Sequence, residues 1–158
     1  MSTIGFDTSN YTTSTAWTDG KTDINVRQIL YVKDGERGIR QSDGVFQHMK
    51  LMPVMYENLS EQIDFKDVKA VGVSTRPRCV EGSYMPVFLA GEGYAKVVAN
   101  TLGVPLYEFS HQDGHIMAGI YSSGSFELLE KDFISVHLSG GTTEILKSRY
   151  NEFNFDNE

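Results

Sequence analysis

The order of strand and helix patterns along the chain is the feature that most restricts its fold. Residues 3–9, 11–18 and 24–32 carry β-branched, aromatic and other apolar residues in strand-like runs. Short turns separate these runs, and one of them, Asp19-Gly20, is a strong hairpin signal. The pattern predicts a three-stranded antiparallel meander. Helix and strand patterns alternate after it, which predicts an α/β fold with a mixed sheet of five to seven strands and helices on its faces.

The later elements follow from apolar spacing and from helix caps. Helices are predicted over residues 43–59, 86–103 and 110–121, and strands over residues 69–74, 104–109, 133–138 and 143–150. Pro53 predicts a kink in the first helix, or two abutting helices. Gly91 and Gly93 would let the second helix approach a neighbouring backbone closely. Ser110 is the expected cap of the third helix. No internal repeat is evident.

Composition limits the partners and the compartment. The 158 residues suit one domain or one lobe of a larger protein. Twenty-one acidic against 14 basic residues give a net charge of -7, which disfavours a broad nucleic-acid surface and leaves Arg76 and Arg78 as a local basic loop. The single cysteine, Cys79, excludes an internal disulfide and favours a reducing compartment. With no signal peptide pattern and no apolar run of ~20 residues, we expect a cytoplasmic chain that does not enter a membrane.

The segment His111-Gln112-Asp113-Gly114-His115 is the sharpest chemical motif. Residues four apart lie on the same face of a helix, so both imidazoles could bind one Zn or Fe ion. Such a site needs a third ligand, which Asp113 cannot supply from the same helix face. The alternative is a pair of half-exposed histidines without a ligand. Gln112 replaces the glutamate of the zinc peptidase motif, so a peptidase has the weakest support.

Two polar turns follow predicted strands. Ser139-Gly140-Gly141 could hold a phosphate through backbone N–H groups, or it could simply join two strands. The turn Asp7-Thr8-Ser9 is similar, and its alternative is an ordinary Asx turn. His48 is interpreted as a packing or boundary histidine. His137 points away from the apolar side of its strand and lies either against a neighbouring element or near the Gly-rich turn.

Taken in order, five of these segments resemble the tRNA threonylcarbamoyladenosine transferase family, whose members were formerly called glycoproteases or O-sialoglycoprotein endopeptidases. The resemblance spans residues 4 to about 146. It rests on the strand and turn of residues 4–9, the helix with His48, the strand of residues 71–74, the two histidines His111 and His115, and the turn of residues 138–141.

The resemblance implies a fold, ligands and an activity. The fold is a ribonuclease-H-like lobe of the actin-like ATPase superfamily, expected over residues 1–150, with residues 151–158 beginning a connection to a second lobe. His111 and His115 would bind a divalent metal, Fe or Zn, with an aspartate from that second lobe. Adenylate would contact His137, Leu138, Ser139, Gly140 and Gly141, and Asp7, Thr8 and Ser9 are further candidates. The family transfers a threonylcarbamoyl group from its adenylate to an adenosine of tRNA.

Three departures from the family pattern predict a divergent member. Tyr11-Thr12 stands where the family has acidic residues, Arg76-Pro77-Arg78 replaces a Gly-Pro-Gly turn, and Thr142 replaces a histidine. A metal- and adenylate-binding paralogue with altered chemistry is therefore expected, and the catalytic residues stay unassigned. The alternative is a non-catalytic subunit of a tRNA-modification complex. Expected partners are a small adenylate, a related subunit in a homo- or heterodimer and, for the complete protein only, tRNA.

Overall fold

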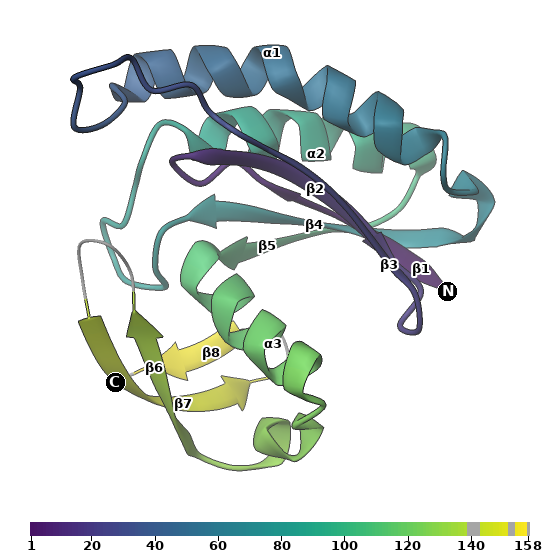
Figure 1. Ribbon diagram of the computed structural model, residues 1–158. Coiled ribbons are helices and arrows are strands. Elements are labelled where there is room, and N and C mark those ends of the chain that lie inside the picture. The colour runs from purple at the N-terminus through teal and green to yellow at the C-terminus, as the bar shows by residue number, and fades with distance from the viewer. Residues whose placement is uncertain (139–142, 152–153, 158) are drawn as a thin grey trace.

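Two β-sheets and three long helices make up the described structure. The computed structural model describes residues 1–138, 143–151 and 154–157 (Figure 1). The elements in chain order are β1 (Ser2–Asp7), β2 (Thr12–Thr18), β3 (Asp23–Ile29), α1 (Gln41–Ser60), β4 (Val68–Arg76), α2 (Phe88–Leu102), β5 (Leu106–Ser110), α3 (His111–Ser123), β6 (Phe133–Leu138), β7 (Thr143–Asn151) and β8 (Asn154–Asn157), with short 3₁₀ turns at Phe65–Asp67 and Phe126–Glu130.

The larger sheet has the strand order β3-β2-β1-β4-β5. Strands β1, β2 and β3 pair antiparallel, whereas β4 pairs parallel with both β1 and β5. The predicted meander and the predicted mixed sheet are thus confirmed. The sheet has five strands, the lower end of the expected range, because β6 and β7 pair with each other and with β8 in a separate three-stranded sheet.

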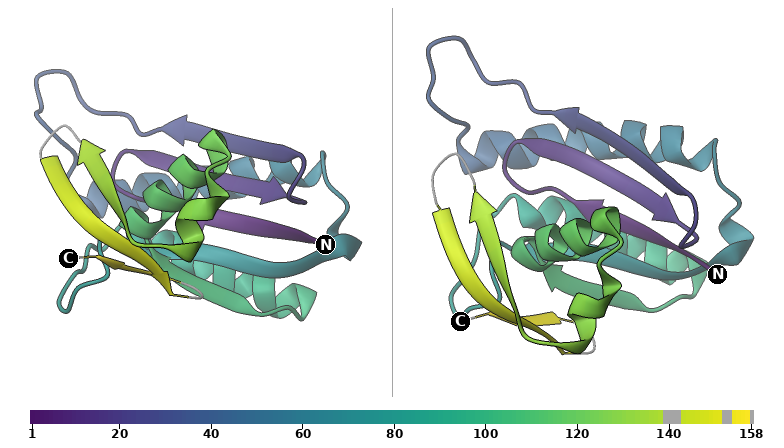
Figure 2. Two further views of the ribbon diagram at one scale, coloured as in Figure 1. Left: turned by 90° about the horizontal axis from the view of Figure 1, so that it is seen from below. Right: turned by 60° about the horizontal axis from the view of Figure 1, so that its bottom comes forward.

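The five-stranded sheet is covered on both faces. Helices α1 and α2 lie on one face, and α3 with the smaller sheet lies on the other (Figures 1 and 2). The main core forms under α1 and α2, where β1 and β4 present alternate residues inward; its buried members are Ile4, Phe6, Met52, Leu59, Val68, Val71, Val73, Ala95 and Ala99. Burial of these apolar side chains is the principal source of stability for this lobe.

Helix α1 differs from the sequence expectation at its start and at Pro53. It begins at Gln41, and its N-cap residue Arg40 makes no side-chain cap, so Asp43 lies inside the first turn. It continues through Pro53 as one helix, so the alternative of two abutting helices is wrong. A proline leaves the carbonyl four residues earlier without its usual donor, and here the hydroxyl of Tyr94 donates to the Met49 carbonyl at 3.0 Å. This contact from α2 replaces the lost hydrogen bond and explains why the helix is not divided.

The second helix also begins later than predicted. Helix α2 starts at Phe88 rather than Pro86, because residues 86 and 87 form a turn ahead of it. Its predicted end at Gly103 is confirmed, with that glycine in the left-handed conformation at φ +66°.

The last strand was not predicted. Residues 151–158 were interpreted as polar connecting chain, but Asn154–Asn157 pairs with β7, and Phe155 is buried. Its apolar signal is one residue long, which is too short for a periodic pattern. The further expectation that this segment leads to a second lobe stays a prediction.

The hairpins β1–β2 and β6–β7 have the same register, although no internal repeat is evident in the sequence. Asp7 pairs with Ser14 in the first hairpin, and His137 pairs with Glu144 in the second, each residue number being larger by 130. Few side chains are shared between the two, so the repeat is visible in the pairing rather than in the sequence. Asp7 and His137 therefore occupy equivalent positions near the ends of β1 and β6.

The two glycines of α2 provide a test of this packing. A Cβ on Gly91 would lie 2.9 Å from Oγ1 of Thr8, whereas a Cβ on Gly93 would have nothing within 4 Å. We expect Gly91→Ala to lower the free energy of unfolding by about 1–2 kcal/mol through overpacking, despite the better helix propensity of alanine. The control Gly93→Ala should raise it by up to about 1 kcal/mol. Urea denaturation measures both, and equal effects of the two substitutions would contradict the packing described.

Candidate functional site

The carboxyl ends of the three parallel strands meet at one edge of the larger sheet. Asp7 ends β1, Arg76 ends β4 and Ser110 ends β5. Ligands of open α/β sheets bind at this edge, where loops and helix starts gather. The edge therefore brings together the predicted turn after β1, the loop after β4 and the start of α3.

The cap of α3 fixes where the first histidine stands. The side chain of Ser110 accepts a hydrogen bond from the Asp113 backbone N–H at 3.1 Å, and the Asp113 carboxylate accepts one from the Ser110 N–H at 3.2 Å. This capping box confirms the predicted cap and starts the helix at His111. It also keeps the buried Asp113 carboxylate within the cap, as expected of a residue that cannot join the two histidines.

Asp7 holds the ring of His111. Nδ1 of His111 lies 2.9 Å from Oδ2 of Asp7, and Oδ1 of Asp7 accepts a hydrogen bond from the Ser9 N–H at 2.7 Å. Burial by itself raises the pKa of Asp7, but the hydrogen bond and charge of His111, with hydrogen bonds from Ser74 and Ser9, lower that pKa to about 2. Asp7 is therefore ionised at neutral pH, and Nε2 of His111 remains for another partner.

His115 lies directly beside His111. Their ring centroids are 4.3 Å apart, one turn of α3 separating the two residues. Burial, with the neighbouring His111 and His137, lowers the pKa of His115, and Asp7 opposes that change. The neutral imidazole favoured in this way is the form that binds a metal ion.

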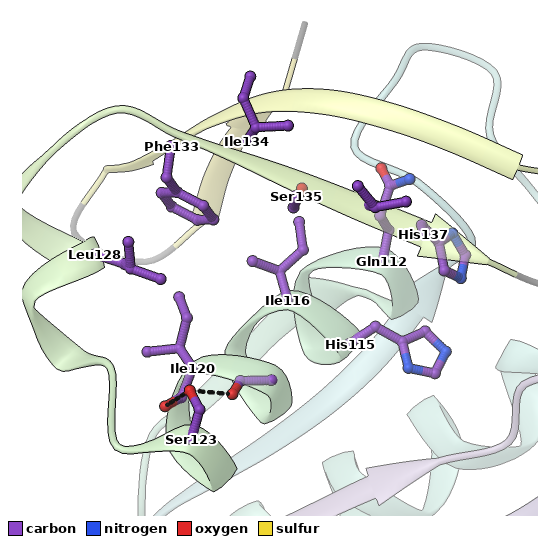
Figure 3. A pocket seen from close by; sticks show the side chains of 12 residues that line it. Gln112, His115, Ile116, Ile120, Ser123, Leu128, Phe133, Ile134, Ser135 and His137 are labelled. Carbon is purple, nitrogen blue, oxygen red and sulfur yellow. Dashed lines mark hydrogen bonds between the residues drawn. The ribbon is translucent and has the colours of Figure 1, made fainter.

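His137 and Glu144 come to the same place from the smaller sheet. The rings of His115 and His137 have centroids 5.3 Å apart, and Figure 3 shows both at one end of a pocket of about 240 Å³ between α3 and β6. Oε2 of Glu144 lies 3.6 Å from Nδ1 of His137. The sequence left the place of His137 open between two alternatives, and the structure puts it against α3.

Glu144 is the site residue that sequence reasoning missed. Its carboxylate accepts a hydrogen bond from Gln112 Nε2 at 3.0 Å and pairs with the Arg78 guanidinium at 2.7 Å. Arg78 thus connects the loop after β4 to the smaller sheet. Only the register of β6 and β7 places residue 144 opposite residue 137, so aligning the two hairpins would have been the signal.

The residues predicted to contact adenylate lie in different surroundings. Ser139, Gly140 and Gly141 lie outside the described residues, and Leu138 is exposed at the end of β6. Thr8 is fully buried, and its hydroxyl donates to the Val87 carbonyl and accepts from the Gly91 N–H. The hydrogen bond from the Ser9 N–H to the Asp7 side chain has the form of an Asx turn.

The hydrogen bonds of His48 and Arg76 go to residues other than His111 and His115. His48 is fully buried and shares a 2.7 Å hydrogen bond with Thr13, which confirms its interpretation as a packing residue. Burial lowers its pKa, although Asp7 and a backbone hydrogen bond oppose this. Arg76 contacts Thr75 and the exposed thiol of Cys79.

The histidine pair fits a transition-metal ion in donor chemistry. Imidazoles are common ligands of Zn and Fe, and a carboxylate hydrogen-bonded to Nδ1 commonly orients such a ligand, as Asp7 does for His111 here. Within residues 1–138, 143–151 and 154–157, no group of three or more His, Cys, Asp or Glu side chains converges on a common point as the side chains stand.

Comparison with known proteins agrees with the fold. YeaZ from Pseudomonas aeruginosa superposes with a TM-score of 0.60 at 11% identity, covering 100% of this chain and 66% of that one. The larger sheet with its helices defines an α/β protein of the actin-like ATPase fold, as predicted. In the described part of the chain, no helix is both long and apolar enough to span a membrane.

The sequence comparison identifies the family. The family model of tRNA N6-adenosine threonylcarbamoyltransferase matches residues 37–157, and the chain belongs to this family. The enzyme of that name from Christiangramia forsetii is 33% identical over 98 residues, or 61% of this chain and 27% of the relative. The one from Pyrobaculum calidifontis is 28% identical over 144 residues, or 90% and 40%. The chain thus spans less than half the length of these curated relatives.

The depressed pKa of Asp7 predicts how stability changes with acid. A carboxyl group whose pKa is lower in the folded than in the unfolded protein stabilises the fold at pH values above its unfolded-state pKa. This stabilisation is lost as the pH falls to the pKa of the folded state. With 3.8 lowered to about 2, Asp7 should contribute about 2 kcal/mol at pH 7 and lose it between about pH 4 and 2.

This is measured by urea denaturation of the metal-free protein in chelator. Asp7→Asn should be less stable than the unaltered chain at pH 7 and should lose less stability between pH 4 and 2. Asp34→Asn, at an exposed carboxylate in the loop after β3, controls for net charge. Parallel pH profiles for the Asp7 variant and the unaltered chain would contradict the ionised role of Asp7.

Proposed function

We propose that this chain forms the first part of a metal- and adenylate-binding protein that acts in threonylcarbamoyl transfer to tRNA, with chemistry altered from that of its relatives. The observation that carries the proposal is the meeting of His111, His115 and the ionised Asp7 at the carboxyl edge of the parallel strands. Family membership supplies the reaction class.

The residues at this edge have separate tasks. His111 and His115 would hold the divalent ion, and Asp7 would keep the His111 ring turned with Nε2 outward. When bound, such an ion acts as a template and Lewis acid toward acyl or phosphate oxygens. The adenylate would contact residues 137–141, a role that is supported by the position of His137 beside His115.

The loop after β4 and the net charge indicate whether this part of the protein contacts tRNA. Arg78 is engaged by Glu144, and the chain carries a net charge of -7. These features disfavour tRNA as a partner of this part of the protein and leave tRNA contact to the complete protein.

Metal analysis tests the proposal. The full-length protein, purified without chelator, should contain about one equivalent of Zn or Fe by inductively coupled plasma mass spectrometry. His111→Ala combined with His115→Ala should remove that metal while the circular dichroism spectrum is kept. Ser122→Ala, on the exposed side of the same helix, is the matched control. Retention of stoichiometric metal by the double variant would refute this assignment.

A second candidate is a non-catalytic subunit that supports a catalytic relative. Tyr11-Thr12 favours it, because Tyr11 in the turn after β1 and Thr12 at the start of β2 stand where the family has acidic residues, and the Tyr11 side chain is exposed. Removing carboxylates of this kind lowers acid–base or electrostatic catalysis by about 10²–10⁴-fold.

Transfer assays on a complex of this protein with a full-length family member from the same cell distinguish the two functions. If the chain is part of an enzyme, the variant with both His111→Ala and His115→Ala should still bind its partner, but the complex should lose the transfer activity that depends on this chain. Unchanged transfer by the complex with that variant would favour the supporting subunit.

A further inference from the structure

We propose that a second pocket, between the larger sheet and the smaller one, binds a small planar molecule that is mostly apolar and carries an N–H donor, such as a heteroaromatic amine. The pocket has a volume of about 430 Å³, which is within the usual range of small-molecule sites. Its lining comes from β1, β4 and β5, from α3, and from β7 and β8. It therefore lies on the face of the larger sheet that α3 covers (Figure 1).

Two neighbouring glycines leave the floor of this pocket without side chains. Gly5 of β1 and Gly72 of β4 are paired in the sheet, and both line the pocket. A Cβ on Gly5 would have nothing within 4 Å, and one on Gly72 would lie 3.4 Å from the ring of Phe109. Neither glycine has a positive φ that would explain it by conformation. Glycine inside a strand forgoes side-chain packing and often marks a place where a ligand comes close.

Aromatic side chains from both sheets contribute to the lining. Tyr107 and Phe109 belong to β5, whereas Tyr150 and Phe155 belong to β7 and β8. The ring centroids of Tyr150 and Phe155 lie 5.4 Å apart. Aromatic rings around a floor of bare backbone favour a flat ring system as the ligand, because such a molecule can contact both with its faces and edges.

Asp113 supplies the polar group that would orient the ligand. This residue is 3% exposed and lines the pocket from α3. Its Oδ2 accepts the hydrogen bond from the Ser110 N–H, whereas its Oδ1 is buried and has no hydrogen-bond partner among the described residues. A buried acceptor without a donor is costly, so an unpaired one in the lining of a pocket points to a donor from a bound molecule.

This pocket is separate from the histidines and from the proposed adenylate contacts. Asp113 is two residues from both His111 and His115, which places it on the opposite side of the helix. The pocket beside His115 shares no described lining residue with this one. The described lining contains no Lys or Arg, and a carboxylate repels phosphate. A neutral or cationic ligand is therefore favoured over a nucleotide, and the inference does not depend on the proposed function.

Binding of 2-aminoquinoline and of quinoline to the full-length protein tests the inference. Both molecules are planar and apolar, but only the first has an exocyclic N–H donor. Isothermal titration should give a dissociation constant on the order of 0.1–1 mM for 2-aminoquinoline, as expected of so small a ligand. Quinoline should bind at least about ten-fold more weakly, because Oδ1 of Asp113 stays unpaired. An excess of AMP should not displace 2-aminoquinoline.

Three variants locate the binding. Gly5→Val puts a side chain on the floor of the pocket, where its Cβ has space, and should abolish binding without lowering stability to urea. Gly93→Val is the matched control, at an exposed glycine of α2 with equal space at its Cβ, and should bind as the unaltered protein does. Asp113→Asn should weaken the binding of 2-aminoquinoline about ten-fold and leave that of quinoline unchanged.

Four results would overturn the inference. Equal affinities of the unaltered protein and the Gly5→Val variant would place the ligand elsewhere. Equal affinities for the two probes would show that Asp113 recognises no donor, and displacement by AMP would make the pocket part of a nucleotide site. Binding of neither probe would show that the pocket takes no such ligand in the complete protein. None of these results alters the metal analysis of the histidine variants, so the two proposals fail separately.

Discussion

The parallel pairing of β1, β4 and β5 is the constraint on which the rest of the structure depends. It aligns the ends of the three strands at one edge. Asp7, Ser74 and Ser110 come from segments far apart in sequence, yet they meet there because parallel strands point their carboxyl ends the same way. The burial of Ile4 and Val71 under α1 and α2 maintains this register, since a slip of one residue would turn those side chains out of the core.

The smaller sheet extends the same geometry. Its first hairpin repeats the register of β1–β2, so His137 stands in β6 where Asp7 stands in β1. The two equivalent positions face the two histidines of α3 from different sides, one as a carboxylate at 2.9 Å from His111 and one as an imidazole beside His115. The contacts of Glu144 with Arg78 and Gln112 then join the smaller sheet to the loop after β4 and to α3.

Local chemistry could be predicted from the sequence, and long-range pairing could not. The Ser110 cap, the end of α2 at Gly103 and the shared face of His111 and His115 each depend on a few neighbouring residues, which is why their signals sufficed. The uninterrupted α1 depends on a hydroxyl of Tyr94, 41 positions from Pro53. The place of Glu144 depends on a strand register, and β8 depends on pairing with β7. No window along the chain contains those partners.

X-ray absorption spectroscopy of the zinc-bound protein tests the central claim, that His111 and His115 at the start of α3 hold one divalent ion. Multiple scattering from imidazole rings counts the histidines around the metal directly. The account predicts two imidazoles in the unaltered protein and one after His115→Ala. Equal numbers of imidazoles in the two proteins, or none in the unaltered protein, would contradict the metal site at the start of α3.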